Sequence, residues 1–76
     1  MPPEGTIETT AIRAHVRESE QAARRLIVRA AHLEKRAQRP RADAAERLSL
    51  TARARELRAD ADVLLAEVSQ LSRRVA

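Results

Sequence analysis

The chain has 76 residues, no cysteine, no aromatic residue and one glycine, and its formal net charge is +4. Without cysteine it can form neither a disulfide framework nor a zinc site with thiolate ligands, and we expect it in the cytoplasm. The lack of aromatic side chains also removes the stacking platforms of single-strand nucleic-acid binders. Alanine, leucine and arginine, all strong helix formers, dominate what remains and predict an all-α protein.

The N-terminal residues 1–5 predict a short flexible lead, because they contain Pro2, Pro3 and the single glycine. We expect one helical-hairpin domain over residues 6–76, with Thr6 as the N-cap of its first helix. The N-terminus is acidic and has no apolar run, so a secretory signal peptide is not expected. No segment reaches the roughly 20 apolar residues needed to cross a bilayer, so no membrane partner is expected either.

A first long helix is expected over residues 6–38, where nothing interrupts a heptad pattern. Its a positions are Thr9, Val16, Ala23, Ala30 and Ala37, and its d positions are Ile12, Ser19, Leu26 and Leu33. Such a pattern is typical of a helix that packs along its length against another helix.

Pro40 is the internal helix breaker, because its ring forces Arg39 out of the helical region and its nitrogen has no proton to donate. Asp43 followed by Glu46 resembles a capping box and indicates that a second helix starts near residue 42. The alternative is that Pro40 only kinks one long helix, which then forms an extended parallel coiled coil. A hairpin is preferred, because the a positions beside the proline are mostly alanine on both sides and would let two helices approach closely.

The second helix is expected over residues 42–75. A leucine recurs in it at every seventh position: Leu50, Leu57, Leu64 and Leu71. These leucines are at d, and the a positions are Arg47, Ala54, Ala61, Val68 and Val75. Two helices of equal length joined by a short turn predict an antiparallel two-helix hairpin. The predicted packing seam consists of Ile12, Val16, Ala23, Leu26, Ala30, Leu33, Leu50, Ala54, Leu57, Ala61, Leu64, Val68, Leu71 and Val75.

This seam is thin, because alanine side chains remove little apolar surface from water. A single core in a chain of this size supplies only about 3–5 kcal/mol. Ile27 and Leu65, both at e positions, widen the apolar stripe to about three positions per heptad, which suits a four-helix bundle. We therefore expect two hairpins to form a homodimer, with Ile27 and Leu65 as the candidate oligomer face.

Catalytic or metal-binding chemistry is not expected. The sequence contains no phosphate-binding glycine loop, no nucleophile elbow and no cluster with metal-ligand spacing. His15 and His32 are seventeen residues apart and are expected to be solvated surface residues. The chain is therefore predicted to have no enzyme activity, no cofactor, no metal and no small-molecule substrate.

The positive charge is concentrated in the middle of the chain. Residues 29–58 contain nine basic and four acidic residues, whereas residues 1–28 are balanced and residues 59–76 carry a net charge of −1. In a hairpin this segment forms a basic tip around the turn, which can attract nucleic acid, anionic lipid or an acidic protein surface. The candidate contacts are Arg29, Lys35, Arg36, Arg39, Arg41 and Arg47.

Two functions fit these patterns. The leading hypothesis is a small non-enzymatic adaptor, docking or regulatory protein whose helices bind each other and a helical partner. The competing hypothesis is a nucleic-acid-binding regulator that uses the basic tip. The two nearly complete heptad seams favour the first hypothesis. The second is less favoured, because the surplus of positive charge is modest and both helices are far longer than those of a helix-turn-helix motif.

Overall fold

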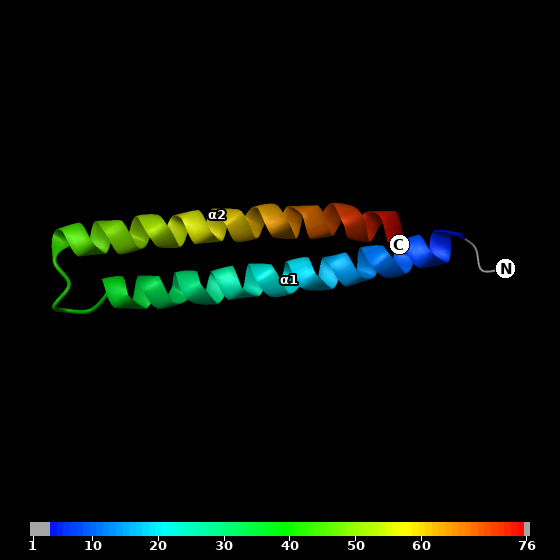
Figure 1. Ribbon diagram of the computed structural model, residues 1–76. Coiled ribbons are helices and arrows are strands. Elements are labelled where there is room, and N and C mark those ends of the chain that lie inside the picture. The colour runs from blue at the N-terminus through cyan, green and yellow to red at the C-terminus, as the bar shows by residue number, and fades with distance from the viewer. Residues whose placement is uncertain (1–3, 76) are drawn as a thin grey trace.

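The computed structural model describes residues 4–75, and the side chains of residues 8–74. Two α-helices and no strand are present in this part of the chain: α1 spans Glu4–Ala37 and α2 spans Ala44–Val75. The helices lie side by side and run in opposite directions (Figure 1). The predicted antiparallel all-α hairpin is confirmed, and the single kinked helix is excluded.

The first helix begins earlier than predicted. It starts at Glu4, so Thr6 is not its N-cap and residues 4 and 5 belong to the helix rather than to a flexible lead. An acidic residue is favourable in a first helical turn, where the free backbone N–H groups carry partial positive charge. Gly5 disfavours the helix by only about 1 kcal/mol relative to alanine. Residues 1–3 of the predicted lead lie outside the described residues.

Pro40 shapes the turn between the helices. Backbone hydrogen bonds from Gln38 N and Arg39 N to the carbonyls three residues earlier, both 3.2 Å, close the last turn of α1. Ala42 N then donates to Arg39 O at 3.1 Å, so residues 39–42 form a β-turn with Pro40 at its second position. No φ among the described residues is positive, which fits a type I turn, and the fixed φ of proline suits that position.

Asp43 caps the second helix, as the sequence predicts. The Glu46 backbone N–H donates to Asp43 Oδ1 at 2.7 Å. The Arg47 N–H donates to the Asp43 carbonyl at 3.0 Å, which is the first helical bond of α2. The side chain of Asp43 therefore satisfies a backbone donor that would otherwise lack a partner in the first turn.

The contact between the helices is built from small side chains. Ala23, Ala30, Ala54 and Ala61 are at most 1% exposed, whereas no large side chain among the described residues is completely buried. The large residues at the d positions of α2 are half-buried beside these alanines: Leu50, Leu57, Leu64 and Leu71. Alanine forms most of the buried contact of the hairpin, Leu33 and Val68 are its larger buried side chains, and the leucines of α2 border it.

The two helices are staggered. In Figure 1, α2 begins beyond the end of α1 at the turn, and α1 extends past the C-terminal end of α2. Two contacts between the helices, Glu34 with Arg58 and His15 with Glu67, are offset along the helix axis in opposite directions. The alignment midway between them places Ala37 level with Leu50 and Ile12 level with Val75, so the helices overlap over about 39 Å. Arg47 lies in the overhang of α2, which explains why this a position is exposed and carries a charge.

The hairpin is long and thin. It measures 65 × 14 × 13 Å, and its radius of gyration is 17.8 Å, against about 11 Å for a compact domain of this length. Its accessible surface is 6283 Å², against about 4,700 Å² for a compact protein of this mass. The chain thus exposes about 1,600 Å² more surface than a globular domain of its size.

Candidate interaction surfaces

The predicted seam residues line the contact between the helices. The buried members are Ala23, Ala30, Leu33, Ala54, Ala61 and Val68. The half-buried members are Ile12, Val16, Leu26, Leu50, Leu57, Leu64 and Leu71. Ala30, Leu33 and Ala54 form one contiguous cluster, and Leu50 and Leu57 pack against it. The side chain of Val75, the last predicted member, lies outside the described side chains.

Two ion pairs join the helices at the sides of this seam, and the second of them is charged only when His15 is protonated. On one side, the Arg58 guanidinium donates two hydrogen bonds to the Glu34 carboxylate, one of them from Nε to Oε2 at 3.3 Å. On the other side, His15 Nε2 lies 3.2 Å from Glu67 Oε1. Both pairs are solvent-exposed, so they contribute little to stability, but they mark how the two helices are aligned.

The ion pair of Glu34 and Arg58 changes the acidity of both groups. The hydrogen bond from the Arg58 guanidinium, assisted by its positive charge, lowers the pKa of the Glu34 carboxyl group. The same contact raises the pKa of Arg58. Glu34 therefore holds its negative charge to a lower pH in the folded chain than in the unfolded chain.

The ion pairs define two sides of the hairpin. Glu34 and Arg58 both occupy e positions, and His15 and Glu67 both occupy g positions, so like positions of the two helices face each other. The e flank contains Arg13, Glu20, Ile27 and Glu34 of α1 and Thr51, Arg58, Leu65 and Ser72 of α2. The g flank contains Glu8, His15, Ala22, Arg29 and Arg36 of α1 and Arg53, Asp60, Glu67 and Arg74 of α2.

The centre of the e flank is apolar. One heptad away from the ion pair of Glu34 and Arg58, toward the open end, lie Ile27 and Leu65, which therefore face each other. Ile27 is half-buried, and Leu65 is 40% exposed. The two residues predicted as an oligomer face are thus neighbours across the helix pair, at the middle of its overlap.

The g flank is polar at the corresponding level. One heptad away from its ion pair, toward the turn, Ala22 faces Asp60. One heptad further, Arg29 faces Arg53, which places two like charges on opposite helices. This flank therefore has no apolar centre.

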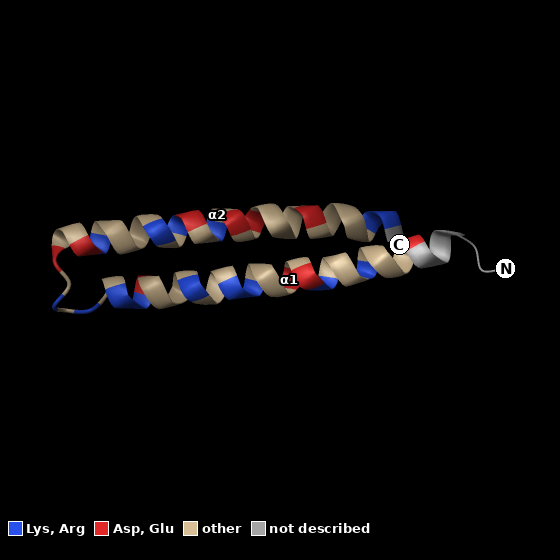
Figure 2. Ribbon diagram, in the orientation of Figure 1, with Lys and Arg blue, Asp and Glu red and all other residues tan. Residues whose placement is uncertain are grey.

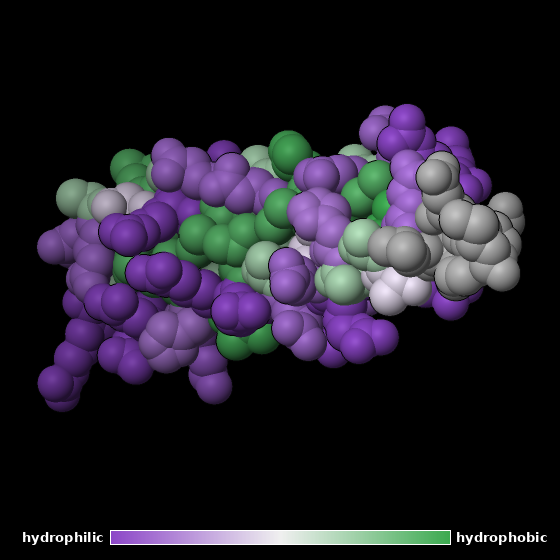
Figure 3. Space-filling view, turned by 45° about the vertical axis from the view of Figure 1, so that its right-hand side comes forward, coloured by the Kyte–Doolittle hydropathy of each residue, from purple (hydrophilic) through white to green (hydrophobic). Residues whose placement is uncertain are grey.

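Sequence reasoning gave no role to three other apolar side chains that the structure leaves exposed: Val28, Leu48 and Val63. Val28 lies on the outer face of α1 in a shallow depression that is also lined by Arg24, Arg25, Arg29 and His32. Leu48 lies in the overhang of α2, where α1 does not cover it. One face of the molecule shows apolar surface along its middle between polar side chains (Figure 3).

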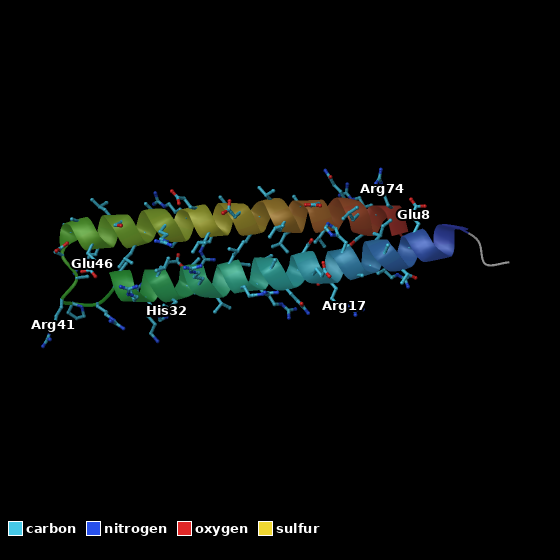
Figure 4. The ribbon with its side chains drawn as sticks, viewed as in Figure 1. Glu8, Arg17, His32, Arg41, Glu46 and Arg74 are labelled. Atoms are coloured by element: carbon cyan, nitrogen blue, oxygen red, sulfur yellow. The ribbon has the colours of Figure 1, made fainter. Side chains whose placement is uncertain are left out.

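The candidate anion contacts lie on the turn and on the ends of the helices beside it. All six are exposed, and none takes part in an ion pair within residues 8–74. Figure 2 shows lysine and arginine along the turn half of α1 and in the turn, whereas acidic and basic residues alternate along α2. The side chains of His32 and Arg41 point away from α2 into solvent (Figure 4). The basic side chains therefore gather at the tip, where Lys35, Arg36 and Arg39 line an open depression beside Pro40.

Among the described residues, no group of three histidine, cysteine, aspartate or glutamate side chains is arranged to hold a metal ion. The same part of the chain contains no helix with an apolar stretch that could cross a membrane. No protein-family model, no characterised protein and no solved structure matches the chain.

Proposed function

We propose that the chain is a small, non-enzymatic interaction module: a cytoplasmic adaptor, docking or regulatory protein that works by helix packing. It binds a second copy of itself and presents helical surface to a helical partner. The observation that supports this proposal is the contrast between a buried core that is mostly alanine and the larger apolar side chains, most of which are left half-buried or exposed around it.

The size of the core supports self-association. Alanine side chains contribute little apolar area, and a chain of this size without a disulfide or a structural metal rarely gains more than about 3–5 kcal/mol from its core. The hairpin exposes about 1,600 Å² more surface than a compact protein of its mass. A standard protein interface takes about 800 Å² from each partner. A second hairpin would therefore cover about half of this excess and complete a four-helix bundle.

Light scattering of the full chain at micromolar concentration tests self-association. The expected mass is that of two chains of 8.5 kDa. A helical, cooperatively folded monomer at this concentration would overturn the proposed self-association.

A second candidate function is nucleic-acid binding through the basic tip, which the exposed cations without ion-pair partners favour. Lysine and arginine contacts to phosphates make such binding strongly dependent on salt. Titration with duplex DNA and RNA in low salt would compare the full chain with a variant carrying three alanines, at Arg36, Arg39 and Arg41. The matched control removes the same charge at the open end, at Arg13, Arg17 and Arg73.

If the tip binds phosphates, the tip variant loses affinity and part of its salt dependence, whereas the open-end variant keeps both. If neither nucleic acid binds in low salt, this second function is excluded, and the interaction module is unaffected.

A further inference from the structure

We propose that the second copy packs on the e flank in an antiparallel orientation, with the turn of each hairpin beside the open end of the other. The two-fold axis of this dimer passes close to Ile27 and Leu65. This inference rests on the proposed self-association and adds to it the face that is used and the direction of packing.

The first argument is the position of the apolar centre. The overlap of the helices covers residues 12–37 of α1 and residues 50–75 of α2. Ile27 lies slightly to the turn side of the middle of this overlap, and Leu65 lies about as far to its open side. If a two-fold axis crosses the long direction at the apolar centre, the two copies cover each other over their full overlap only if that centre lies at the middle. A parallel dimer sets no such condition, so the central position favours the antiparallel one.

The second argument is the order of charges along the e flank. Glu34 and Arg58 lie on the turn side of the apolar centre, and Glu20 lies on its open side. In the antiparallel dimer, Arg58 of one copy is level with Glu20 of the other. Glu34 is level with the segment of α1 that carries Arg13 and Arg17. Opposite charges thus meet beside the apolar centre, which favours this register of the two copies.

The third argument is the charge of the whole hairpin. Residues 29–58 carry a net charge of +5, whereas residues 1–28 are neutral and residues 59–76 carry −1. A parallel dimer would hold two basic tips side by side. The antiparallel dimer places each basic tip beside a neutral or weakly acidic end, so long-range repulsion between the copies is smaller.

The stagger of the helices fits the same arrangement. Each hairpin has an overhang of α2 at its turn end and an overhang of α1 at its open end (Figure 1). In the antiparallel dimer the α2 overhang of one copy is level with the α1 overhang of the other. Leu48, 73% exposed on the α2 overhang, then lies level with a helix of the second copy.

The g flank is a poor alternative face. Its centre contains Asp60 opposite Ala22. A second copy on this flank would bring the Asp60 carboxylates of both copies to the middle of the interface, where charged groups are depleted.

Because the chain has no cysteine, single thiols can be introduced and joined by a short bis-maleimide, to which each thiol adds across a maleimide double bond. Leu65→Cys is expected to give a covalent dimer. Asp60→Cys, on the opposite flank, is the matched control and is expected to give several-fold less covalent dimer. The mass of each variant is measured before cross-linking.

The direction of packing is tested at two e positions near the ends of the overlap, Thr51 and Ser72. In the antiparallel dimer, Thr51 of one copy lies beside Ser72 of the second copy. Each of these residues lies far from the same residue of the second copy. The double variant Thr51→Cys/Ser72→Cys should therefore cross-link, whereas the two single variants should not.

The possible failures are distinguishable. If the unmodified chain is dimeric but Leu65→Cys cross-links no better than Asp60→Cys, the e flank is the wrong face and self-association stands. If Thr51→Cys and Ser72→Cys each cross-link alone, the dimer is parallel. If the unmodified chain is monomeric, both this inference and the proposed self-association fail.

Discussion

The e flank and the g flank are built from the same two helices, and each carries one ion pair between them, yet their centres differ. Ile27 faces Leu65 on the e flank, whereas Ala22 faces Asp60 on the g flank. The ion pairs mark the alignment of the helices on both sides. The residues at the centre decide which side can be buried without desolvating a charge.

The largest effect is expected from Leu57→Asp, which disrupts the seam that both flanks share. The substitution removes an apolar contact to the cluster around Ala30 and places an unpaired charge beside it. Loss of a core leucine costs about 2–5 kcal/mol, which is comparable with the whole contribution of such a core. Circular dichroism should therefore show loss of helix. Ala59→Asp adds the same charge on the exposed side of α2 and should leave the helix content unchanged; equal loss in both variants would contradict the assigned seam.

A smaller effect, confined to assembly, is expected from Leu65→Asp. The new charge lies at the proposed dimer axis and should weaken dimerisation at least about tenfold, or about 1.4 kcal/mol. Sedimentation at several concentrations measures the dissociation constant. Val63→Asp is the matched control, because Val63 is 68% exposed and lies off the e flank. Equal dissociation constants for the two variants would show that the e flank is not the interface.

Asp43→Ala should destabilise the turn end of both flanks alike, by about 1 kcal/mol. The substitution removes the acceptor for the Glu46 backbone N–H. Thermal unfolding measures the loss, and Asp43→Asn, which keeps a capping oxygen, should stay close to the unmodified chain. If alanine and asparagine have the same effect, the cap is not what stabilises the start of α2.

The smallest effect is expected from Glu34→Gln, and it should depend on pH. Because the pKa of Glu34 is lowered in the folded chain, its stabilising contribution is present above its unfolded pKa of about 4.3 and is lost as the pH falls through the folded value. The unmodified chain should therefore lose more stability in acid than the Glu34→Gln variant. Thermal unfolding from neutral pH to acid compares the two, and parallel curves would contradict a stabilising role for this ion pair.

The sequence was sufficient to predict the hairpin, because a heptad pattern determines the buried face of each helix and Pro40 separates the two helices. The start of α1 lies two residues before the predicted position near residue 6, since competing start signals near Thr6 differ by only about 1 kcal/mol. Ile27 and Leu65 were predicted as a face from their e positions. That they lie opposite each other could not be predicted, because neighbouring heptads are similar and the seams can be aligned in several ways.

The alignment became visible only through contacts between residues far apart in the chain. The pair of Glu34 and Arg58 joins residues 24 positions apart, and no local rule for charges on one helix reveals it. The same alignment explains Arg47, which occupies an a position of the heptad pattern but was predicted as an anion contact and not as a seam residue. Its exposure follows from the stagger of the helices, which depends on the path of the turn around Pro40.

The central claim is that a second copy completes the thin core of the hairpin. Thermal unfolding of the unmodified chain over a hundredfold range of protein concentration tests this claim most directly. If two copies fold together, the unfolding midpoint rises with concentration, because mass action favours the assembled state. A cooperative transition whose midpoint is independent of concentration would show that the hairpin is stable alone and would contradict the claim.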